Sequence, residues 1–376
     1  ILLHIGLPMK KVSAFLIAIA AVLAACSEKP VEPIRIGFIG GLSGPNSDNG
    51  QSGLNGLTLA VEQFNRAGGA NGRLVEIMAK DDAQSKETAQ ASANQLVTAK
   101  VEAVVGPFTS GMAAVIVPIT GQAGIFQISP TITAMEFQGK DDNLYRINRT
   151  TRDNAGDYAK VMYSRGQKRI AVAYDLRNRS FTQSWLDEFR TAVEGLGASV
   201  AAEVSYESSK DADFEGVVTK MLQSKPDGLL FISGALDVAR LAQAARKLAP
   251  RLPIAASEWA ATEQLIDLGG EVVEGLLIVQ NYDRDDASPR FKEFSDAYFK
   301  RFQRNPGYSS VSTYDAATVV LTALKNRKPG EPVKAAVARS GPYQGLQQEI
   351  VFDSNGDTIR KVYFTEIREG RYRRID

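Results

Sequence analysis

The sequence predicts an α/β protein made of two doubly wound, Rossmann-like lobes of parallel β-sheet. Three observations lead to this prediction. The chain has 376 residues, 44% of them hydrophobic, which suffices for about two domains. Short apolar runs without clean alternation, typical of strands buried on both faces, alternate with segments of helical periodicity. These runs form two consecutive series with similar spacing, and each series predicts one lobe.

The first series contains five expected strands. They span residues 34–39, 74–79, 102–105, 125–128 and 144–147. Between the first two, an apolar stripe that runs from Leu54 to Phe64 at helical spacing predicts an amphipathic helix. Gly68 and Gly69 can end that helix, because glycine readily adopts the positive φ of a helix terminus. Strand, helix and strand at this spacing predict right-handed βαβ units.

The second series also contains five expected strands. They span residues 169–174, 199–206, 228–232, 253–256 and 275–279. Polar segments at 148–153, 280–288 and 340–344 are the expected connections between the lobes. Beyond them, residues 349–352, 353–357 and 359–367 predict a strand, a turn and a strand. The turn resembles part of a calcium loop, but Gly356 is out of place for one, so a hairpin turn is expected.

Residues 1–25 predict an export signal. Met9, where translation is expected to begin, is followed by two lysines and an apolar run to Ala25 that is too short to span a bilayer. Small residues precede Cys26, the only cysteine, as in the lipobox of bacterial lipoproteins. An ordinary signal peptide with a chance cysteine is the alternative. Acylation of Cys26 would tether the exported protein to the membrane through its lipid, with residues 26–33 as a linker.

Composition excludes several classes of function. Removal of the signal removes His4, the only histidine, and acylation of Cys26 leaves no thiol. Catalysis by Ser-His-Asp or Cys-His groups and zinc sites with His or Cys ligands are therefore excluded. With Lys+Arg 44 against Asp+Glu 43, no bulk charge attracts nucleic acid. Phosphate-loop and dinucleotide-loop motifs are absent from the sequence, and we expect no cofactor and no metal.

Two loops of the first lobe place hydroxyl groups at the carboxyl ends of strands, where α/β sheets bind ligands. Residues 106–111 lead from a buried strand into a helix that starts near Ser110. Its free N–H groups and the Ser110 hydroxyl could receive a carboxylate, or Ser110 could only cap its own helix. After the next strand, Thr131 and Thr133 would point the same way in an extended segment. Two surface threonines in a polar loop are the alternative.

Two loops of the second lobe could complete a site. Glu258 and Trp259 follow a strand, and a carboxylate beside an indole suits a cationic group. An exposed glutamate beside a core tryptophan is the alternative. Asp175, Ser180 and Phe181 lie beyond another strand and could line the opposite wall, although a solvated loop fits the residues equally well.

Together these loops resemble the periplasmic leucine/isoleucine/valine-binding protein family, the type I solute-binding proteins of ATP-driven amino-acid importers. The similarity extends from about residue 34 to 371. Its motifs are, in order, residues 36–40, 42–45, 80–82, 106–110, 129–133, Glu258 and 352–357. Each motif is weak alone, but their order and spacing are specific.

The resemblance implies the type I periplasmic binding protein fold, with two lobes joined by three crossings and the ligand held between them. It implies that residues 34–148 and 281–345 form lobe 1, and that 149–280 and 346–376 form lobe 2. Ser110 and Thr133 then match the ligands of a carboxylate. The Thr131 carbonyl, Thr133 hydroxyl and Glu258 carboxylate match the ligands of an α-ammonium group. A zwitterion would be satisfied only when both lobes close around it.

The expected wall of the side-chain pocket departs from the family. Asn49 stands where members that bind branched aliphatic residues usually have an aromatic, and their tyrosines fall near Ser180 and near Ala235 or Leu236. We therefore expect a side chain that is polar or larger than leucine. The expected wall residues are Asn49, Phe108, Thr109, Asp175, Ser180, Phe181, Ala235, Trp259 and Tyr282.

These observations predict a lipid-anchored, non-enzymatic solute-binding protein at the periplasmic or extracytoplasmic face of a membrane. It is expected to capture an α-amino acid, branched-chain-like or a more polar analogue, in the cleft between the lobes and to deliver it to the membrane permease of an ABC-type importer. One alternative is a subunit that senses a ligand for a membrane receptor, and another is a receptor for amides or aromatic acids. An α/β enzyme acting on small molecules fits less well.

Overall fold

The computed structural model describes residues 32–44 and 47–375. The expected export signal, the lipobox and Cys26 therefore lie outside the described residues, as does most of the expected linker. Within the described part of the chain, no helix is both long enough and apolar enough to cross a membrane.

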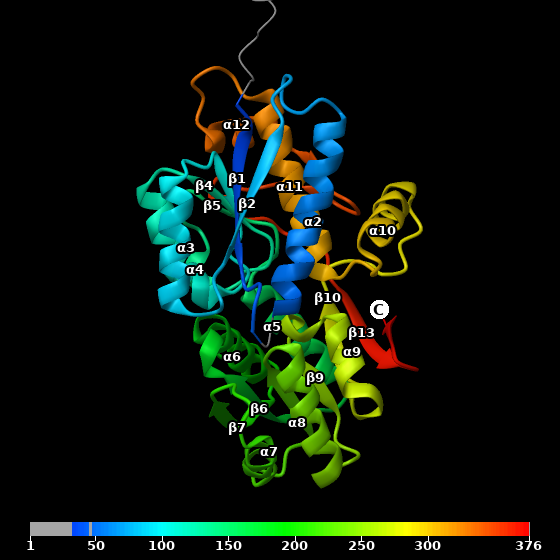
Figure 1. Cartoon of the computed structure of the whole chain (residues 1–376). Helices are drawn as coiled ribbons and strands as arrows, with labels where there is room; N and C mark the ends of the chain where they lie inside the picture. Colours follow the sequence, from blue (N-terminus) through cyan, green and yellow to red (C-terminus); the bar gives the residue numbers. More distant parts are fainter. Residues whose placement is uncertain (1–31, 45–46, 376) are drawn as a thin grey trace, which may run out of the picture. The chain divides into compact units, whose positions relative to one another are not determined.

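The first lobe is built on a five-stranded parallel sheet with the order β2-β1-β3-β4-β5. Its strands are β1 (Ile34–Gly40), β2 (Val75–Asp81), β3 (Ala103–Val105), β4 (Phe126–Ser129) and β5 (Leu144–Arg146). All five expected strands of the first series are confirmed, with ends shifted by one or two residues. Figure 1 shows α3 (Lys86–Thr98) and α4 (Ser110–Gln122) on one side of this sheet. α2 (Ser47–Arg66) and α11 (Tyr308–Asn326) pack together on the other side.

The second lobe is built on a seven-stranded sheet with the order β14-β13-β10-β9-β8-β6-β7. Its parallel strands are β6 (Arg169–Asp175), β7 (Ser199–Tyr206), β8 (Gly228–Ile232), β9 (Ile254–Ala256) and β10 (Leu277–Gln280). These five strands confirm the second series of expected strands, with ends shifted by at most two residues. β13 (Tyr363–Arg368) and β14 (Arg371–Arg374) run antiparallel at one edge. The sequence analysis missed β14 because Tyr372 is its only buried residue and arginines surround it.

Helices cover both faces of the second sheet, as expected for strands buried on both sides. α5 (Thr151–Ser164) and α6 (Arg179–Gly195) supply Tyr158, Trp185 and Phe189 to the core on one face. α7 (Phe214–Leu222) and α8 (Ala235–Leu248) pack on the other face. α5 begins with a reciprocal cap between Thr150 and Asp153, which fixes the helix start directly after the first crossing between the lobes.

The segment after residue 340 stays with the first lobe longer than the sequence analysis expected. β11 (Tyr343–Gln344) and β12 (Glu349–Ile350) form a small hairpin, and Tyr343 and Ile350 are buried in the core of the first sheet. The turn expected at 353–357 is present, and the Asp357 carboxylate accepts a 2.7 Å hydrogen bond from Nε of Arg146. We therefore propose that the third crossing follows residue 358, rather than residue 345.

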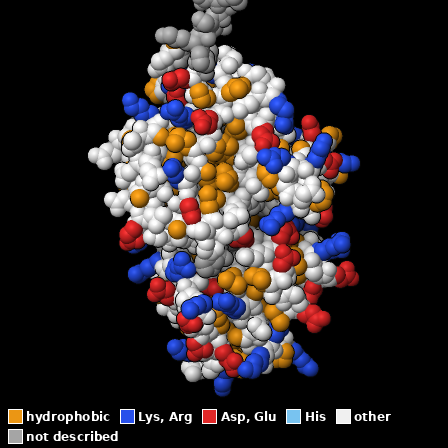
Figure 2. All heavy atoms as spheres, viewed as in Figure 1, with side chains coloured by type: hydrophobic (Ala, Val, Ile, Leu, Met, Phe, Trp, Pro, Cys, Tyr) orange, Lys and Arg blue, Asp and Glu red, His pale blue; other side chains and the backbone are white. Residues whose placement is uncertain are grey.

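The remaining helices lie between and beside these elements. α9 (Glu263–Gly269), α10 (Pro289–Phe302) and α12 (Val333–Ser340) complete the described helices, together with the short 3₁₀ turns η1 (Met135–Phe137), η2 (Leu176–Asn178), η3 (Glu258–Ala260) and η4 (Gly270–Val273). Figure 2 shows acidic and basic side chains interspersed over the visible face of both lobes.

Candidate binding site

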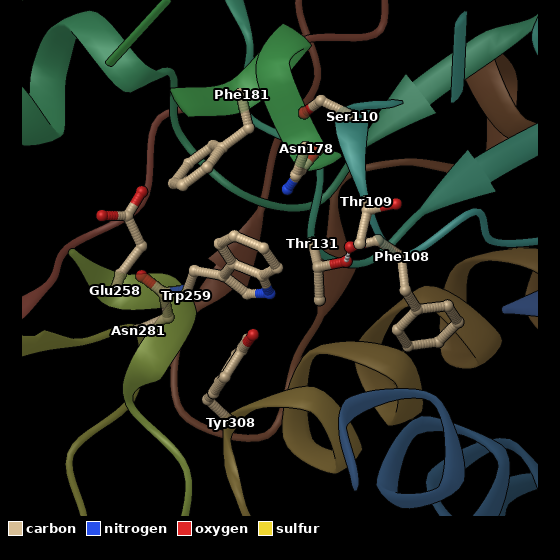
Figure 3. Close-up of a pocket in the computed structure, with 10 residues that line it drawn as sticks. All are labelled: Phe108, Thr109, Ser110, Thr131, Asn178, Phe181, Glu258, Trp259, Asn281 and Tyr308. Atoms are coloured by element: carbon tan, nitrogen blue, oxygen red, sulfur yellow. Dashed lines mark hydrogen bonds between the residues drawn. The ribbon is translucent and has the colours of Figure 1, made fainter. Parts of the chain in front are cut away.

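A cavity lies where the carboxyl ends of strands from the two sheets face each other. Its empty volume is ≈ 320 Å³, which includes space that is open to solvent. Its lining residues come from loops or helix starts of both lobes. They are Phe108, Thr109, Ser110, Thr131, Asn178, Phe181, Glu258, Trp259, Asn281 and Tyr308 (Figure 3).

The first lobe contributes the N-terminus of α4. Thr109 is the N-cap of this helix but its side chain makes no capping hydrogen bond, and Ser110 is the first helical residue. The Ser110 hydroxyl is buried and has no hydrogen-bond partner among the described residues. Because a helix N-terminus carries free N–H groups and a partial positive charge, this end of the cavity suits an anion such as a carboxylate.

The loop after β4 lies beside this helix start. The Thr131 hydroxyl donates a 2.7 Å hydrogen bond to the Phe108 carbonyl, which joins the two loops. The Thr133 hydroxyl is buried and, among residues 32–44 and 47–375, unpartnered. Thr133 is not among the residues that line the cavity, whereas Thr131 is. Thr131 thus lines the site together with Ser110, and Thr133 does not.

The second lobe contributes Glu258, which stands in η3 directly after β9. Its side chain is 4% exposed. One carboxylate oxygen accepts a 2.8 Å hydrogen bond from the Asn154 amide, and the other accepts a 3.0 Å bond from the Trp185 indole. Burial raises the pKa of the Glu258 carboxyl, while these hydrogen bonds and the charge of Arg149 oppose that rise.

Glu258 is the only formally charged residue among those that line the cavity. A buried carboxylate without a cationic neighbour in the lining favours a ligand that brings its own positive charge. The cavity thus offers hydrogen-bond donors on the first lobe and a carboxylate on the second.

Aromatic side chains form the apolar part of the wall. Phe181 and Trp259 are both buried and meet edge to face, with ring centroids 5.9 Å apart. Phe108, expected as a further wall, lines the cavity but turns its ring toward α2 and α11 (Figure 3). That ring packs against Phe38 with centroids 5.2 Å apart, so most of it belongs to the core.

The other five expected wall residues are not part of the lining. Asn49 and Asp175 are held inside their own lobes: Asn49 accepts a hydrogen bond from Ser309, and Asp175 accepts from the backbone N–H groups of Arg177 and Ser208.

The last three residues, Ser180, Ala235 and Tyr282, make their contacts outside the lining. Ser180 donates its hydroxyl hydrogen bond to Glu136, which comes from the other lobe. Ala235 begins α8 and is buried in the core beneath it. The Tyr282 hydroxyl donates to the Pro306 carbonyl at 3.1 Å.

Three lining residues were missed by the sequence analysis. Asn178 ends η2, Asn281 follows β10, and Tyr308 begins α11. Asn281 lies within a segment that the sequence marked only as a connection, and a tyrosine at a helix start has no distinctive pattern. Burial raises the pKa of the Tyr308 hydroxyl, and the nearby carboxylates of Asp48 and Glu258 add to that rise, so it stays protonated and can donate.

The lobes also touch each other directly around the cavity. The backbone N–H of Met135, on the first lobe, donates a 3.1 Å hydrogen bond to the hydroxyl of Ser184 in α6. The N–H of Gly111 in α4 donates to the amide oxygen of Asn178 at 2.9 Å. These contacts describe a closed arrangement of the two lobes.

Two lobes that close on a cavity with complementary polar groups are suited to hold a small polar ligand. The chain belongs to the periplasmic binding protein family, whose model matches residues 33–371. Family membership confirms the predicted family, the fold class and the non-enzymatic role, and implies an extracytoplasmic location. Among curated proteins, the leucine-, isoleucine-, valine-, threonine- and alanine-binding protein of Pseudomonas aeruginosa is 27% identical over 308 residues, covering 80% of each chain.

Solved structures show the same fold. The branched-chain amino acid transporter substrate-binding protein LivJ of Streptococcus pneumoniae, in complex with isoleucine, aligns with a TM-score of 0.83 at 23% identity, covering 90% of this chain and 97% of that one. A solute-binding protein of R. palustris in complex with benzoate aligns with a TM-score of 0.81 at 18% identity, covering 91% of this chain and 95% of that one.

Proposed function

We propose that this protein binds an α-amino acid in the cleft between its lobes and delivers it to the permease of an ABC-type importer. One observation carries the proposal: Ser110, at the start of α4, and Glu258, in the second lobe, line the same cavity. The first can receive an α-carboxylate and the second an α-ammonium group. The names of the Pseudomonas and Streptococcus relatives support an amino acid as ligand and a transporter as partner.

The site residues follow from this proposal. Ser110 and Thr133 are assigned to the carboxylate, and the Thr131 carbonyl, Thr133 and Glu258 to the ammonium group. Thr133 reaches the ligand in this scheme only if its buried hydroxyl turns toward the cavity, because it is not part of the present lining. Ser110 and Glu258 therefore carry more of the assignment than Thr133.

Calorimetry with the twenty amino acids, on protein freed of carried ligand by unfolding and refolding, tests this proposal. We expect at least one amino acid to bind, and expect its amide derivative and its deaminated acid to bind far more weakly, because each lacks one of the two charges. Equal binding of the deaminated acid would contradict the role of Glu258. Loss of uptake of the same amino acid in a deletion strain would separate transport from sensing for a membrane receptor.

An aromatic acid is the second candidate ligand. The edge-to-face pair of Phe181 and Trp259 offers a wall for an aromatic ring, and the R. palustris neighbour is bound to benzoate. Such a ligand has no ammonium group and would leave the Glu258 carboxylate without a cation. Benzoate in the same calorimetric series decides between the two ligand classes.

We also propose that Cys26 carries the lipid that anchors the protein to the membrane. The proposal is based on the small residues that precede Cys26 at the end of the apolar run. Replacement Cys26→Ser is expected to move the protein from the membrane fraction to the soluble extracytoplasmic fraction. A parent protein that already fractionates as soluble would contradict the anchor.

A further inference from the structure

The two charged ends of an amino acid do not use all the polar groups of the cavity. Ser110 and the start of α4 serve the carboxylate, and Glu258 serves the ammonium group. Besides the Thr109 hydroxyl, four hydrogen-bonding side chains of the lining then remain: Asn178, Trp259, Asn281 and Tyr308. Because the start of α4 and Glu258 are assigned to the two charged groups, these four are left for the side chain of the ligand.

These groups face the cavity. Figure 3 shows the Tyr308 hydroxyl, the Trp259 nitrogen and the Asn178 amide nitrogen directed toward the middle of the pocket. Neither the Asn281 amide nor the Trp259 N–H has a hydrogen-bond partner elsewhere in the described residues. The Asn178 oxygen is used by Gly111, which leaves its NH₂ group for the cavity.

The charges of the lining restrict which side chain the ligand can have. The lining contains no lysine and no arginine, so a ligand carboxylate at the side-chain end would be buried without a cation. Glu258 is the only carboxylate in the lining and is already matched to the α-ammonium group. A second positive charge would therefore lack a partner in the lining.

An aliphatic side chain would leave the polar groups unsatisfied. When the lobes close, water is displaced and each unpaired N–H or hydroxyl carries a desolvation penalty. Sites that are built to hydrogen-bond a ligand group discriminate strongly against analogues that lack it. The aromatic faces of Phe181 and Trp259 still favour some apolar contact.

We infer that the preferred ligand is an α-amino acid with a neutral, hydrogen-bonding side chain, namely an amide or a hydroxyl. This inference rests on the proposed function and names the ligand class of the same cavity. Tyr308 and Asn281 act as specificity-determining residues, since they lie at the side-chain end and are not needed for the charged groups.

Calorimetry with pairs of ligands of equal shape tests the inference. Asparagine is compared with leucine, threonine with valine, and glutamate and lysine serve as charged comparisons. We expect asparagine or threonine to bind at least about tenfold more tightly than its apolar partner. Leucine or valine binding as tightly as its polar partner overturns the inference, and so does a preference for glutamate or lysine. If no amino acid binds, the proposed function itself fails, which is a distinct result.

Two conservative variants assign the preference to residues. Tyr308→Phe and Asn281→Leu are expected to reduce the polar-to-apolar ratio severalfold by weakening the polar ligand, with little change for the apolar one. Tyr163→Phe, on a half-buried surface tyrosine of α5 far from the lining, is the matched control and should leave the ratio unchanged. An equal loss for both ligands in the cavity variants would indicate a structural role and overturn the assignment.

Discussion

The amide oxygen of Asn178 accepts a 2.9 Å hydrogen bond from the backbone N–H of Gly111, and this bond joins the two lobes. Gly111 stands in the first turn of α4, next to Ser110. A Cβ at position 111 would lie 3.2 Å from that amide oxygen, so glycine permits the close approach. One N–H of the helix start is therefore satisfied by the other lobe, and the Ser110 hydroxyl is left for the ligand.

Asn178→Leu is expected to destabilise the closed arrangement. The substitution keeps the shape of the side chain but removes the acceptor, which corresponds to about 0.5–1.5 kcal/mol for a typical hydrogen bond. We expect a larger radius of gyration of the unliganded protein, because the closed arrangement is less populated. Asn94→Leu, on the exposed surface of α3, is the control. An unchanged radius of gyration would show that this bond does not contribute to closure.

Glu258→Gln is expected to weaken amino-acid binding by about ten- to a hundredfold, because a hydrogen bond to a charged group contributes about 1.5–3 kcal/mol. The folded structure should persist, since the shape of the side chain is kept. Calorimetry measures the affinity and thermal unfolding checks the fold. Glu271→Gln, at an exposed glutamate of the same lobe, should bind like the parent. Parent-like affinity of Glu258→Gln would refute the ammonium assignment.

Binding is expected to weaken on acidification. Because burial raises the pKa of the Glu258 carboxyl, this group takes up its proton at a higher pH than an ordinary glutamate. Below that pKa the ammonium group of the ligand loses its counter-charge, and the affinity falls by up to about tenfold per pH unit. Calorimetry between pH 4.5 and about 8 should show this slope in the parent and not in Glu258→Gln. If both proteins show the same slope, the pH dependence of binding comes from a titratable group other than Glu258.

The raised pKa of the Glu258 carboxyl also affects how the stability of the unliganded protein depends on pH. The folded state has the higher pKa and so binds the proton more tightly than the unfolded state. The contribution of Glu258 to the free energy of unfolding is therefore greatest below the unfolded pKa. It declines as the pH rises through the raised folded pKa.

Gly53→Ala is expected to lower stability although alanine favours helix. A Cβ at this position of α2 would overlap the ring of Phe108. The next residue, Thr109, is the N-cap of α4 and lines the cavity. Overpacking typically costs about 1–3 kcal/mol, which exceeds the gain of up to about 1 kcal/mol from helix propensity. Denaturant unfolding measures the difference. Gly156→Ala in α5, where nothing lies within 4 Å of a new Cβ, should be neutral or stabilising. A larger loss of stability in Gly156→Ala than in Gly53→Ala would contradict the close packing of Gly53 against Phe108.

Sequence patterns predicted the ten parallel strands well because most are short β-rich runs buried on both faces, and only the edge strands β2 and β7 are largely half-buried. Ser110, Thr131 and Glu258 were found because they follow such strands, and the carboxyl ends of parallel strands converge. Asn178 also follows a strand, β6, but only its neighbours Asp175, Ser180 and Phe181 were expected at the site. Tyr308 carries no such signal, since it begins a helix and its position in the cavity depends on how the two lobes meet.

The third crossing that we propose differs from the expected one for a related reason. Residues 349–352 look like any short strand, and nothing local indicates which sheet they join. The contacts that support it are distant in sequence: Phe352 packs on Tyr145, with ring centroids 4.9 Å apart, and Asp357 accepts a 2.7 Å hydrogen bond from Nε of Arg146. Composition and periodicity contain no information about such partners.

Asn154 and Trp185, the two donors that hold Glu258, belong to α5 and α6 of its own lobe. These two donors hold the orientation of the carboxylate independently of the first lobe. The side chain of Glu258 therefore loses its rotational freedom during folding, and not each time a ligand binds. An incoming molecule thus meets a rigid half-site on one side.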